Sequence, residues 1–259
     1  MEPARELSIV SEAGDLSASV DAVVAEFGGA VETCSGVLSS TLPIGAGLSS
    51  SAAVHVVLTL ALGNLEGLEL ALAAQRAEHR ALGVPSGILD QAASALGRDG
   101  HAVLIDFGTL AFEHVPLPEG LAIVVVDSGV ARRNAETGYA VRKGELEEGM
   151  PSRLRHIESE NDRVLAAVAA LRAADLDTLG GLFRAGHDSL RDDFEVTTPE
   201  LDRLVDLAYA NGAIAARMTG GGFGGAIVAL VDADRAHHFA ERMPGAAWVT
   251  RASAGAREL

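Results

Sequence analysis

Residues 42–53 read LPIGAGLSSSAA, a turn with one proline and two glycines that is followed by three serines and two alanines. We expect this turn to join a strand over 37–42 to a helix that begins near Ser51. The first N–H groups of a helix have no partner within the helix, and together with the helix dipole they attract anions. Because glycine also lets the backbone approach a ligand closely, the stretch is typical of a phosphate-binding loop. A serine N-cap after a tight turn is the alternative that needs no ligand.

Two common phosphate-binding loops do not match this stretch. The Walker pattern needs a lysine directly before a Ser or Thr, and the only lysine of the chain is Lys143. The dinucleotide-binding pattern needs a third glycine at the position of Ser50. A phosphate loop at residues 42–53 therefore belongs to another class.

Composition indicates a folded, acidic protein. Of the 259 residues 48% are hydrophobic, which is ample for a core, and the formal net charge is −16, which repels nucleic acid and anionic membranes. Cys34 is the only cysteine, so the sequence excludes an internal disulfide and a cysteine-based zinc cluster. No stretch has the pattern of a signal peptide or a membrane span. We therefore expect a cytoplasmic protein, monomer or dimer, that binds neither nucleic acid nor membranes.

Helical and strand patterns mix along the chain without a strict alternation. The spacing of apolar residues predicts helices over 17–27, 51–62, 69–82, 85–97, 152–173, 175–190, 199–209 and 235–242. Strands are expected over 7–12, 37–42, 102–107, 121–127, 214–218 and 226–231. This mixture favours an α+β fold over a doubly wound sheet. A boundary near Pro118 would separate an N-terminal domain (1–118) from a C-terminal domain (119–259).

Several stretches in order resemble the galactokinase branch of the GHMP kinases, a family of small-molecule kinases. They are PIGAGLSSSAA (43–53), AEHRALGVPSGILDQAASALGRDGHAVLIDF (77–107), YAVRKGELE (139–147), RHIESENDRVLAAVAAL (155–171), HDSLRDDFEVTTPELD (187–202) and MTGGGFGGAIVAL (218–230). The likeness runs from about Leu7 to Val231, and its ordered matches are far more specific than one glycine loop. It implies a two-domain GHMP kinase fold with an N-terminal ATP-binding part, whose phosphate loop is atypical, and a ferredoxin-like C-terminal part.

The resemblance assigns ATP and Mg²⁺ to the N-terminal part. Glu78 lies at the position that binds Mg²⁺ in galactokinases, and Ser51 is the preferred hydroxyl ligand of the metal. Taken alone, a glutamate in an amphipathic helix would be a solvated residue. The positions that the resemblance implies for ATP and its phosphates are Pro43, Gly45, Ala46, Gly47, Leu48, Ser49, Ser50, Ser51 and Ala52.

Asp90 stands where galactokinases keep an aspartate beside the sugar hydroxyl at C1. A carboxylate within the mostly apolar run 88–96 is costly unless it has partners or a task. It would accept the hydroxyl proton as general base or orient the hydroxyl for attack. Without the flanking motif, a helix residue turned to solvent is the simpler interpretation. Tyr139 and Gly87 are the other sugar-binding positions that the resemblance implies.

A glycine cluster follows the strand expected over 214–218. Glycine costs backbone entropy and fills no space, so the cluster favours a functional loop over core packing. A strained hairpin is the alternative. In the resemblance the cluster is the third signature of the family and shapes the site, and its members are Gly220, Gly221, Gly222, Gly224 and Gly225.

The first signature of galactokinases, approximately Gly-Arg-Val-Asn-Leu-Ile-Gly-Glu-His-Thr-Asp-Tyr, has no counterpart in this sequence. It carries an arginine near the transferred phosphoryl group, together with acidic and histidine contacts to the sugar. The segment after Glu148 is also shorter than usual, and Ser86 replaces a common cysteine. We expect either a start upstream of Met1 or a natural short form with altered function. The candidates to replace the arginine are Arg132, Arg133 and Arg142.

Together these observations predict an ATP- and Mg²⁺-dependent kinase for the anomeric hydroxyl of galactose or a similar hexose. Two alternatives stay open. One is a catalytically weak or inactive sensor that binds nucleotide and sugar. The other is a GHMP kinase for another small alcohol, such as a heptose or an isoprenoid alcohol.

Overall fold

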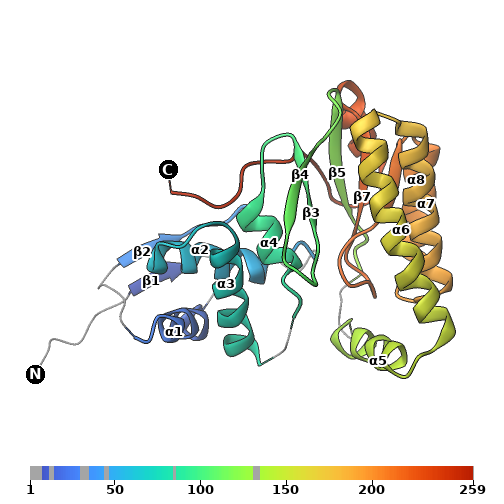
Figure 1. Cartoon of the computed structure of the whole chain (residues 1–259). Helices are drawn as coiled ribbons and strands as arrows, with labels where there is room; N and C mark the ends of the chain where they lie inside the picture. The colour runs from blue at the N-terminus through green and yellow to red at the C-terminus, as the bar shows by residue number, and fades with distance from the viewer. Residues whose placement is uncertain are drawn as a thin grey trace, which may run out of the picture. The chain divides into compact units, whose positions relative to one another are not determined.

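The computed structural model describes residues 8–11, 15–29, 35–43, 47–83, 86–130 and 135–258 (Figure 1). The chain divides into two compact units. The first comprises Met1–Ile44, Ser49–Asp99 and Ser253–Leu259, and the second comprises Gly45–Leu48 and Gly100–Ala252. The domain boundary expected near Pro118 stays a prediction.

The first unit consists, in its described part, of a small sheet and four helices. Strands β1 (Ser8–Ser11) and β2 (Ser35–Leu38) pair in parallel, and the helices are α1 (Ser17–Glu26), α2 (Ser50–Gly63), α3 (Gly67–Leu82) and α4 (Leu89–Leu96). Helix α3 packs against the other three. Its buried face is mostly alanine, which lets neighbouring helices approach closely. Ion pairs from Glu26 to Arg76 at 2.5 Å and to Arg80 at 3.3 Å tie α1 to α3.

The second unit combines a hairpin, a larger sheet and a layer of helices. Its elements are β3 (His101–Ile105), β4 (Phe112–Pro116), β5 (Leu121–Asp127), α5 (Ala135–Glu147), α6 (Pro151–Ala173), α7 (Leu176–Asp192), α8 (Pro199–Ala210), β6 (Ala215–Met218), β7 (Ala226–Asp232), a 3₁₀ turn (Ala233–Arg235), α9 (Ala236–Arg242) and β8 (Ala247–Thr250). Strands β3 and β4 form an antiparallel hairpin. The other strands form a sheet in the order β6-β7-β5-β8, in which every pair is antiparallel.

This strand order identifies the second sheet as ferredoxin-like. In chain order the sheet is built as strand β5, helices α5–α8, strands β6 and β7, helix α9 and strand β8, which is the split βαββαβ arrangement. Inward residues of β5 alternate with less buried ones, whereas β7 is buried along most of its length. Both strands pack with α8 and α9 in the main core of the unit. The α+β fold with a ferredoxin-like C-terminal part, expected from the resemblance, is therefore present.

Most predicted elements lie within two residues of their expected bounds, and the exceptions have weak patterns. Helix α4 begins at Leu89 instead of residue 85. Strand β2 covers Ser35–Leu38 instead of residues 37–42. Strands β4 and β8 and helix α5 were absent from the predicted elements. Strand β4 has only one fully buried side chain, Val115, and β8 has none, so neither shows the clear alternation of a half-buried strand.

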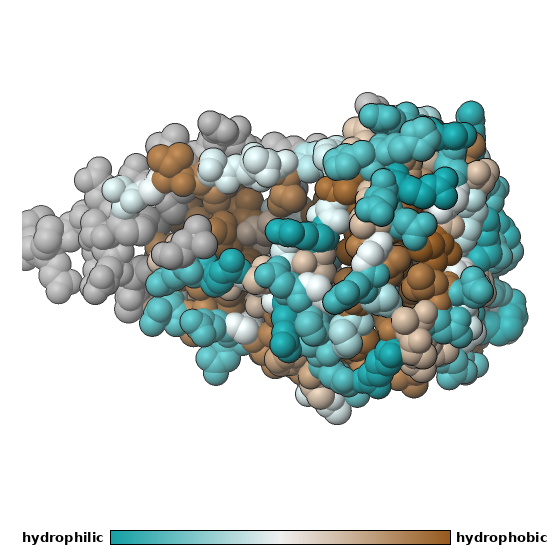
Figure 2. Space-filling model, turned by 90° about the horizontal axis from the view of Figure 1, so that it is seen from above, coloured by the Kyte–Doolittle hydropathy of each residue, from teal (hydrophilic) through white to brown (hydrophobic). Residues whose placement is uncertain are grey.

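Charged and polar residues dominate the visible surface. Figure 2 shows hydrophilic residues over much of one face, with smaller hydrophobic areas between them. No single helix in the described ranges is long and apolar enough to cross a membrane. Helices α2 and α3 meet that criterion only as a pair, and they are bent by 114° relative to each other.

Candidate functional site

The loop predicted to bind phosphate leads into α2 through two residues with left-handed backbone. Gly47 has φ +74°, and Ser49, the N-cap of α2, has φ +55°. The Ser49 side chain makes no capping hydrogen bond, so the structure does not support the alternative of a plain serine N-cap. A left-handed serine is strained, and such strain is common at ligand-binding sites. The N–H groups of the first turn of α2 thus lack a side-chain cap and are suited to bind an anion.

The other predicted loop positions are placed as follows. Pro43 and Leu48 are half-buried, and Ala52 is buried at the start of α2. Gly45 and Ala46 lie outside the described residues. The phosphate-contacting role of the loop stays a prediction, and the structure describes its second half only from Gly47 onward.

Glu78 lies on α3 with an exposed fraction of only 6%, so it is not the solvated helix residue that its sequence position alone would suggest. Its Oε2 accepts hydrogen bonds from Ser86 Oγ, at 3.3 Å, and from Gln91 Nε2. Its Oε1 has no hydrogen-bond partner among the described residues, and it is not among their fully enclosed unpartnered atoms. A buried carboxylate is costly unless donors or a cation compensate it. One held oxygen and one open oxygen are the arrangement of a monodentate metal ligand.

The donors in the first unit fit a Mg²⁺ ion that is shared with a nucleotide. Within the described ranges, no group of three or more His, Cys, Asp and Glu side chains converges. Mg²⁺ does not need such a cluster, because it is commonly bound by one or two protein oxygens, phosphate oxygens and water. Ser51 in the first turn of α2 and Glu78 on α3 supply hard oxygen donors from two helices that pack together.

Asp90 is the second residue of α4 and is exposed. Its carboxylate therefore avoids the burial cost that the apolar run suggested, and it lies in the first turn, where the helix dipole favours negative charge. The neighbouring Gln91 is 1% exposed, so the two side chains leave the helix on different faces. Gly87, just before α4, is exposed, and a Cβ added to it would have no neighbour within 4 Å. Asp90 and Gly87 thus lie within four residues of each other in an open part of the first unit.

In the second unit, the helix that carries Tyr139 contacts the glycine loop. The backbone of Tyr139 is in α5, and its side chain lies outside the described residues. A Cβ at Gly138 would come within 2.7 to 2.9 Å of the Phe223 ring, so the ring lies directly against the α5 backbone. Phe223 itself has φ +59° in the middle of the glycine loop. The structure thus brings the tyrosine segment and the third signature together.

The glycine loop closes the β6–β7 hairpin, and packing explains part of its composition. Gly222 has φ +82°, and a Cβ there would lie 2.2 Å from Val196 O. Gly224 has φ +119°, and its Cβ would lie 2.6 Å from Val130 O. The Phe223 N–H donates to Val196 O at 2.7 Å. Close packing therefore accounts for two of the five glycines without any ligand. Positive φ at Gly220 (+75°) and Gly225 (+87°) accounts for two more.

Replacing Gly222 with alanine is expected to destabilise the protein. The left-handed backbone costs a non-glycine residue about 1–2 kcal/mol, and the clash with Val196 adds about 1–3 kcal/mol. Gly212→Ala is the matched control, because Gly212 has φ +92° and its Cβ would contact only the Arg235 side chain, at 3.6 Å or more. In urea unfolding, the free energy of unfolding of Gly222→Ala should be well below that of Gly212→Ala. Equal stabilities would show that the loop moves away from Val196 without cost.

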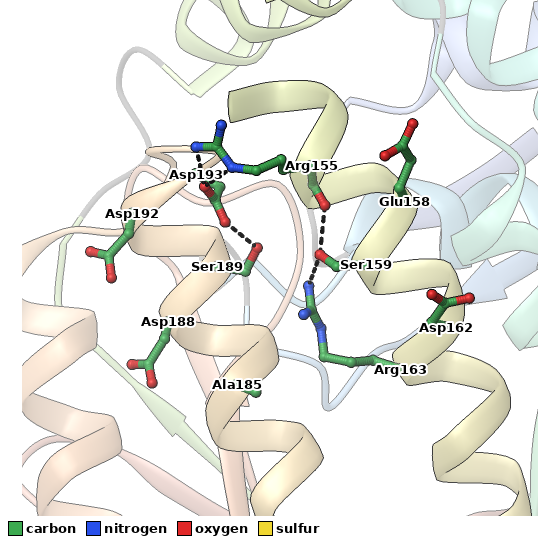
Figure 3. A pocket seen from close by; sticks show the side chains of 10 residues that line it. All are labelled: Arg155, Glu158, Ser159, Asp162, Arg163, Ala185, Asp188, Ser189, Asp192 and Asp193. Carbon is green, nitrogen blue, oxygen red and sulfur yellow. Dashed lines mark hydrogen bonds and ion pairs between the residues drawn. The ribbon is translucent and has the colours of Figure 1, made fainter. Parts of the chain in front are cut away.

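A groove along α6 and α7 is lined by none of the predicted site residues (Figure 3). Ser189 Oγ donates to Asp193 Oδ2 at 3.0 Å, so Nδ1 of His156, 3.0 Å away, must carry the hydrogen and donate to Ser189. Burial lowers the pKa of His156 and favours this neutral form. The network ties α6 to α7, and we assign the groove no ligand. Its volume is about 670 Å³, and its lining residues are Arg155, Glu158, Ser159, Asp162, Arg163, Ala185, Asp188, Ser189, Asp192 and Asp193.

Comparison with known families accounts for both units. The model of the GHMP kinases N terminal domain matches residues 16–98, and that of the GHMP kinases C terminal domain matches residues 167–249. The chain therefore belongs to the GHMP kinase family. Within that family its sequence is similar to galactokinases, which confirms the resemblance seen in the motifs.

Two galactokinases illustrate this similarity. The galactokinase of Chloroflexus aggregans is 42% identical over 245 residues, which cover 80% of this chain and 63% of the relative. The structure of Lactococcus lactis galactokinase in complex with galactose has a TM-score of 0.82 at 28% identity and covers 98% of this chain and 84% of that one. Mevalonate kinase of L. major, with a TM-score of 0.68 at 24% identity over 97% and 82% of the two chains, supports the fold alone. The chain spans less than two thirds of the length of the curated relative.

Proposed function

We propose that the chain is a galactokinase-type phosphotransferase, which transfers the γ-phosphate of ATP to the anomeric hydroxyl of galactose or a similar hexose. The observation that most directly supports ATP is the uncapped N-terminus of α2 after left-handed Gly47 and Ser49. Galactose as the sugar is supported by the galactokinases to which the sequence is similar. The cytoplasmic location and the choice between monomer and dimer stay predictions.

In this proposal the backbone N–H groups at the start of α2 hold the ATP phosphates and resist their movement during transfer. Asp90 orients the sugar hydroxyl or accepts its proton, and its exposure leaves the carboxylate oxygens available to a substrate. Tyr139 contributes a contact to the sugar, and the glycine loop shapes the site. Catalysis of phosphoryl transfer depends mostly on such positioning and on charge stabilisation.

The proposed Mg²⁺ ligands are Glu78 Oε1 and the Ser51 hydroxyl. When bound, Mg²⁺ would neutralise part of the phosphate charge. The role of the chain is to hold these oxygens in place before the nucleotide arrives. The buried position of Glu78 serves that purpose, because the carboxylate has little freedom to move.

Glu78→Gln is expected to weaken ATP binding in the presence of Mg²⁺ by about 10–100-fold or more, since even loss of an indirect metal contact has an effect of that size. Binding of ATP in excess chelator should change little. Titration calorimetry under both conditions measures the difference. The control is Glu69→Gln, which removes the same charge from an exposed position on α3. Its affinity for ATP should equal that of the parent both with Mg²⁺ and in excess chelator. An equal loss with and without Mg²⁺ would make Glu78 a structural residue.

A further inference from the structure

Glu78 is held by two side chains that come from outside its own helix. Gln91 Nε2 on α4 and Ser86 Oγ just before α4 both donate to the same atom, Oε2. Both bonds are assisted by the carboxylate charge, which makes them stronger than neutral ones. With Oε2 fixed in this way, only Oε1 is left for another partner.

We propose that Gln91 is a positioning residue for the metal ligand, which aims Glu78 Oε1 at the cation, and that Ser86 assists it. This inference rests on the proposed function, because it assumes that Glu78 binds Mg²⁺ with ATP. Groups that orient metal ligands through hydrogen bonds commonly matter nearly as much as the ligands themselves.

The orientation of the Gln91 amide supports this role. Gln91 is 1% exposed, and its Oε1 is a buried acceptor without a hydrogen-bond partner among the described residues. Reversing the amide would bring this oxygen against Glu78 Oε2, so that two acceptors would face each other. The amide is therefore fixed by the carboxylate, although this leaves its own oxygen unpaired at a cost in free energy. An apolar side chain would fill the same space without leaving a buried oxygen unpaired, so packing alone does not explain a glutamine at this position.

Ser86 is in turn fixed by α3. Gln75 Nε2 donates to Ser86 O at 2.9 Å, and the Ser86 N–H lies 2.8 Å from His79 Nε2. These contacts hold the backbone that presents the Ser86 hydroxyl to Glu78. The Ser86 hydroxyl thus holds Oε2 together with the Gln91 amide.

The arrangement also joins the two proposed carboxylates of the site. Gln91 directly follows Asp90 on α4 and reaches Glu78 on α3. A displacement of α4 would therefore move Asp90 and loosen the metal ligand at the same time. We therefore expect loss of the Gln91 amide to weaken Mg²⁺ binding. The affinity for ATP in the absence of Mg²⁺ should hardly change.

The test is Gln91→Met, which keeps a similar volume and removes the donor. The Mg²⁺ concentration that gives half of the metal-dependent gain in ATP affinity should rise by about 10–100-fold. The dissociation constant for ATP in excess EDTA should be that of the parent. Ser86→Ala, at an exposed position, should shift the Mg²⁺ requirement in the same direction but less, because its 3.3 Å bond is longer.

Ser94→Ala is the matched control for Ser86→Ala, since it removes a hydroxyl from α4 that makes no hydrogen bond to Glu78. It should keep the Mg²⁺ requirement of the parent. If Glu78→Gln loses the Mg²⁺ effect while Gln91→Met and Ser86→Ala both keep it, the positioning role is wrong and the proposed function stands. If the parent shows no Mg²⁺ effect on ATP binding, the proposed function and this inference fall together. Should Gln91→Met fail to fold, Ser86→Ala decides by the same measurement.

Discussion

Replacing Gly47 with valine is expected to abolish the stabilisation of this protein by MgATP. Gly47 has φ +74°, a backbone conformation that a β-branched residue rarely adopts, and it lies two residues before the N-cap of α2. Valine would change the path of the phosphate loop and place two methyl groups where phosphate oxygens are expected. For the parent, a ligand at a hundredfold excess over its dissociation constant adds about 2.7 kcal/mol of stability. Thermal unfolding with and without millimolar MgATP measures this gain.

Gly29→Val controls for backbone strain. Gly29 has φ +75°, nearly the same as Gly47, and a Cβ there would have no neighbour within 4 Å. This variant should lose stability in the absence of ligand and still gain the full MgATP shift. Retention of the shift in Gly47→Val, or no shift in the parent, would contradict a phosphate-binding role for the loop.

Local patterns in the sequence predicted elements whose burial alternates or repeats over several residues. Strand β5 has the expected bounds, because its side chains alternate between buried and half-buried positions along its whole length. Helix α8 begins at Pro199 after Thr198, whose hydroxyl accepts a hydrogen bond from the Leu201 N–H. A threonine followed by a proline is a sequence signal for the start of a helix. The order of strands in the sheet followed from the family resemblance, since pairing between distant strands has no local signal.

The candidate site was predictable as a set of positions but not as a set of contacts. Glu78 and Gln91 are 13 residues apart on two helices, and nothing in their local sequence predicts that the amide will hold the carboxylate. The sequence identified Ser86 only as a departure from the family pattern. In the same way, Gly222 is required by Val196, a residue from a distant loop. In each case tertiary packing supplies the reason, and a local pattern does not contain it.

These 259 residues contain no counterpart of the arginine in the family's first signature. Among the arginines considered as substitutes, Arg132 and Arg133 lie outside the described residues. Arg142 pairs with Glu145 at 2.9 Å and with Glu195 at 3.2 Å, so two carboxylates already compensate its charge. Freeing it for a phosphoryl group would break both ion pairs. Arg142 is therefore a poor replacement for an arginine that stabilises the transition state.

For this reason the 259-residue chain is expected to bind MgATP but to phosphorylate galactose far more slowly than the usual kinase rate of about 1–100 s⁻¹. An arginine at the transferred phosphoryl group can contribute about 10³–10⁵ in rate. A fusion that adds an upstream galactokinase segment with the Gly-Arg-Val-Asn signature should recover much of that factor. The same fusion with the signature arginine replaced by methionine is its control and should gain little.

In the active fusion, Asp90→Asn should lower the rate of galactose phosphorylation by a factor of about 10²–10⁴, which is the usual contribution of a general base. Binding of MgATP should stay unchanged, because Asp90 is exposed and makes no contact with Glu78 among the described hydrogen bonds. Coupled assays of ATP consumption on the chain, the fusion and the fusion variants measure these rates. Turnover of galactose by the 259-residue chain itself at about 1–100 s⁻¹ would mean that another cation of this chain reaches the phosphoryl group. In that case Arg132→Met and Arg133→Met in the 259-residue chain are the variants to test first, because the charge of Arg142 is already compensated by Glu145 and Glu195.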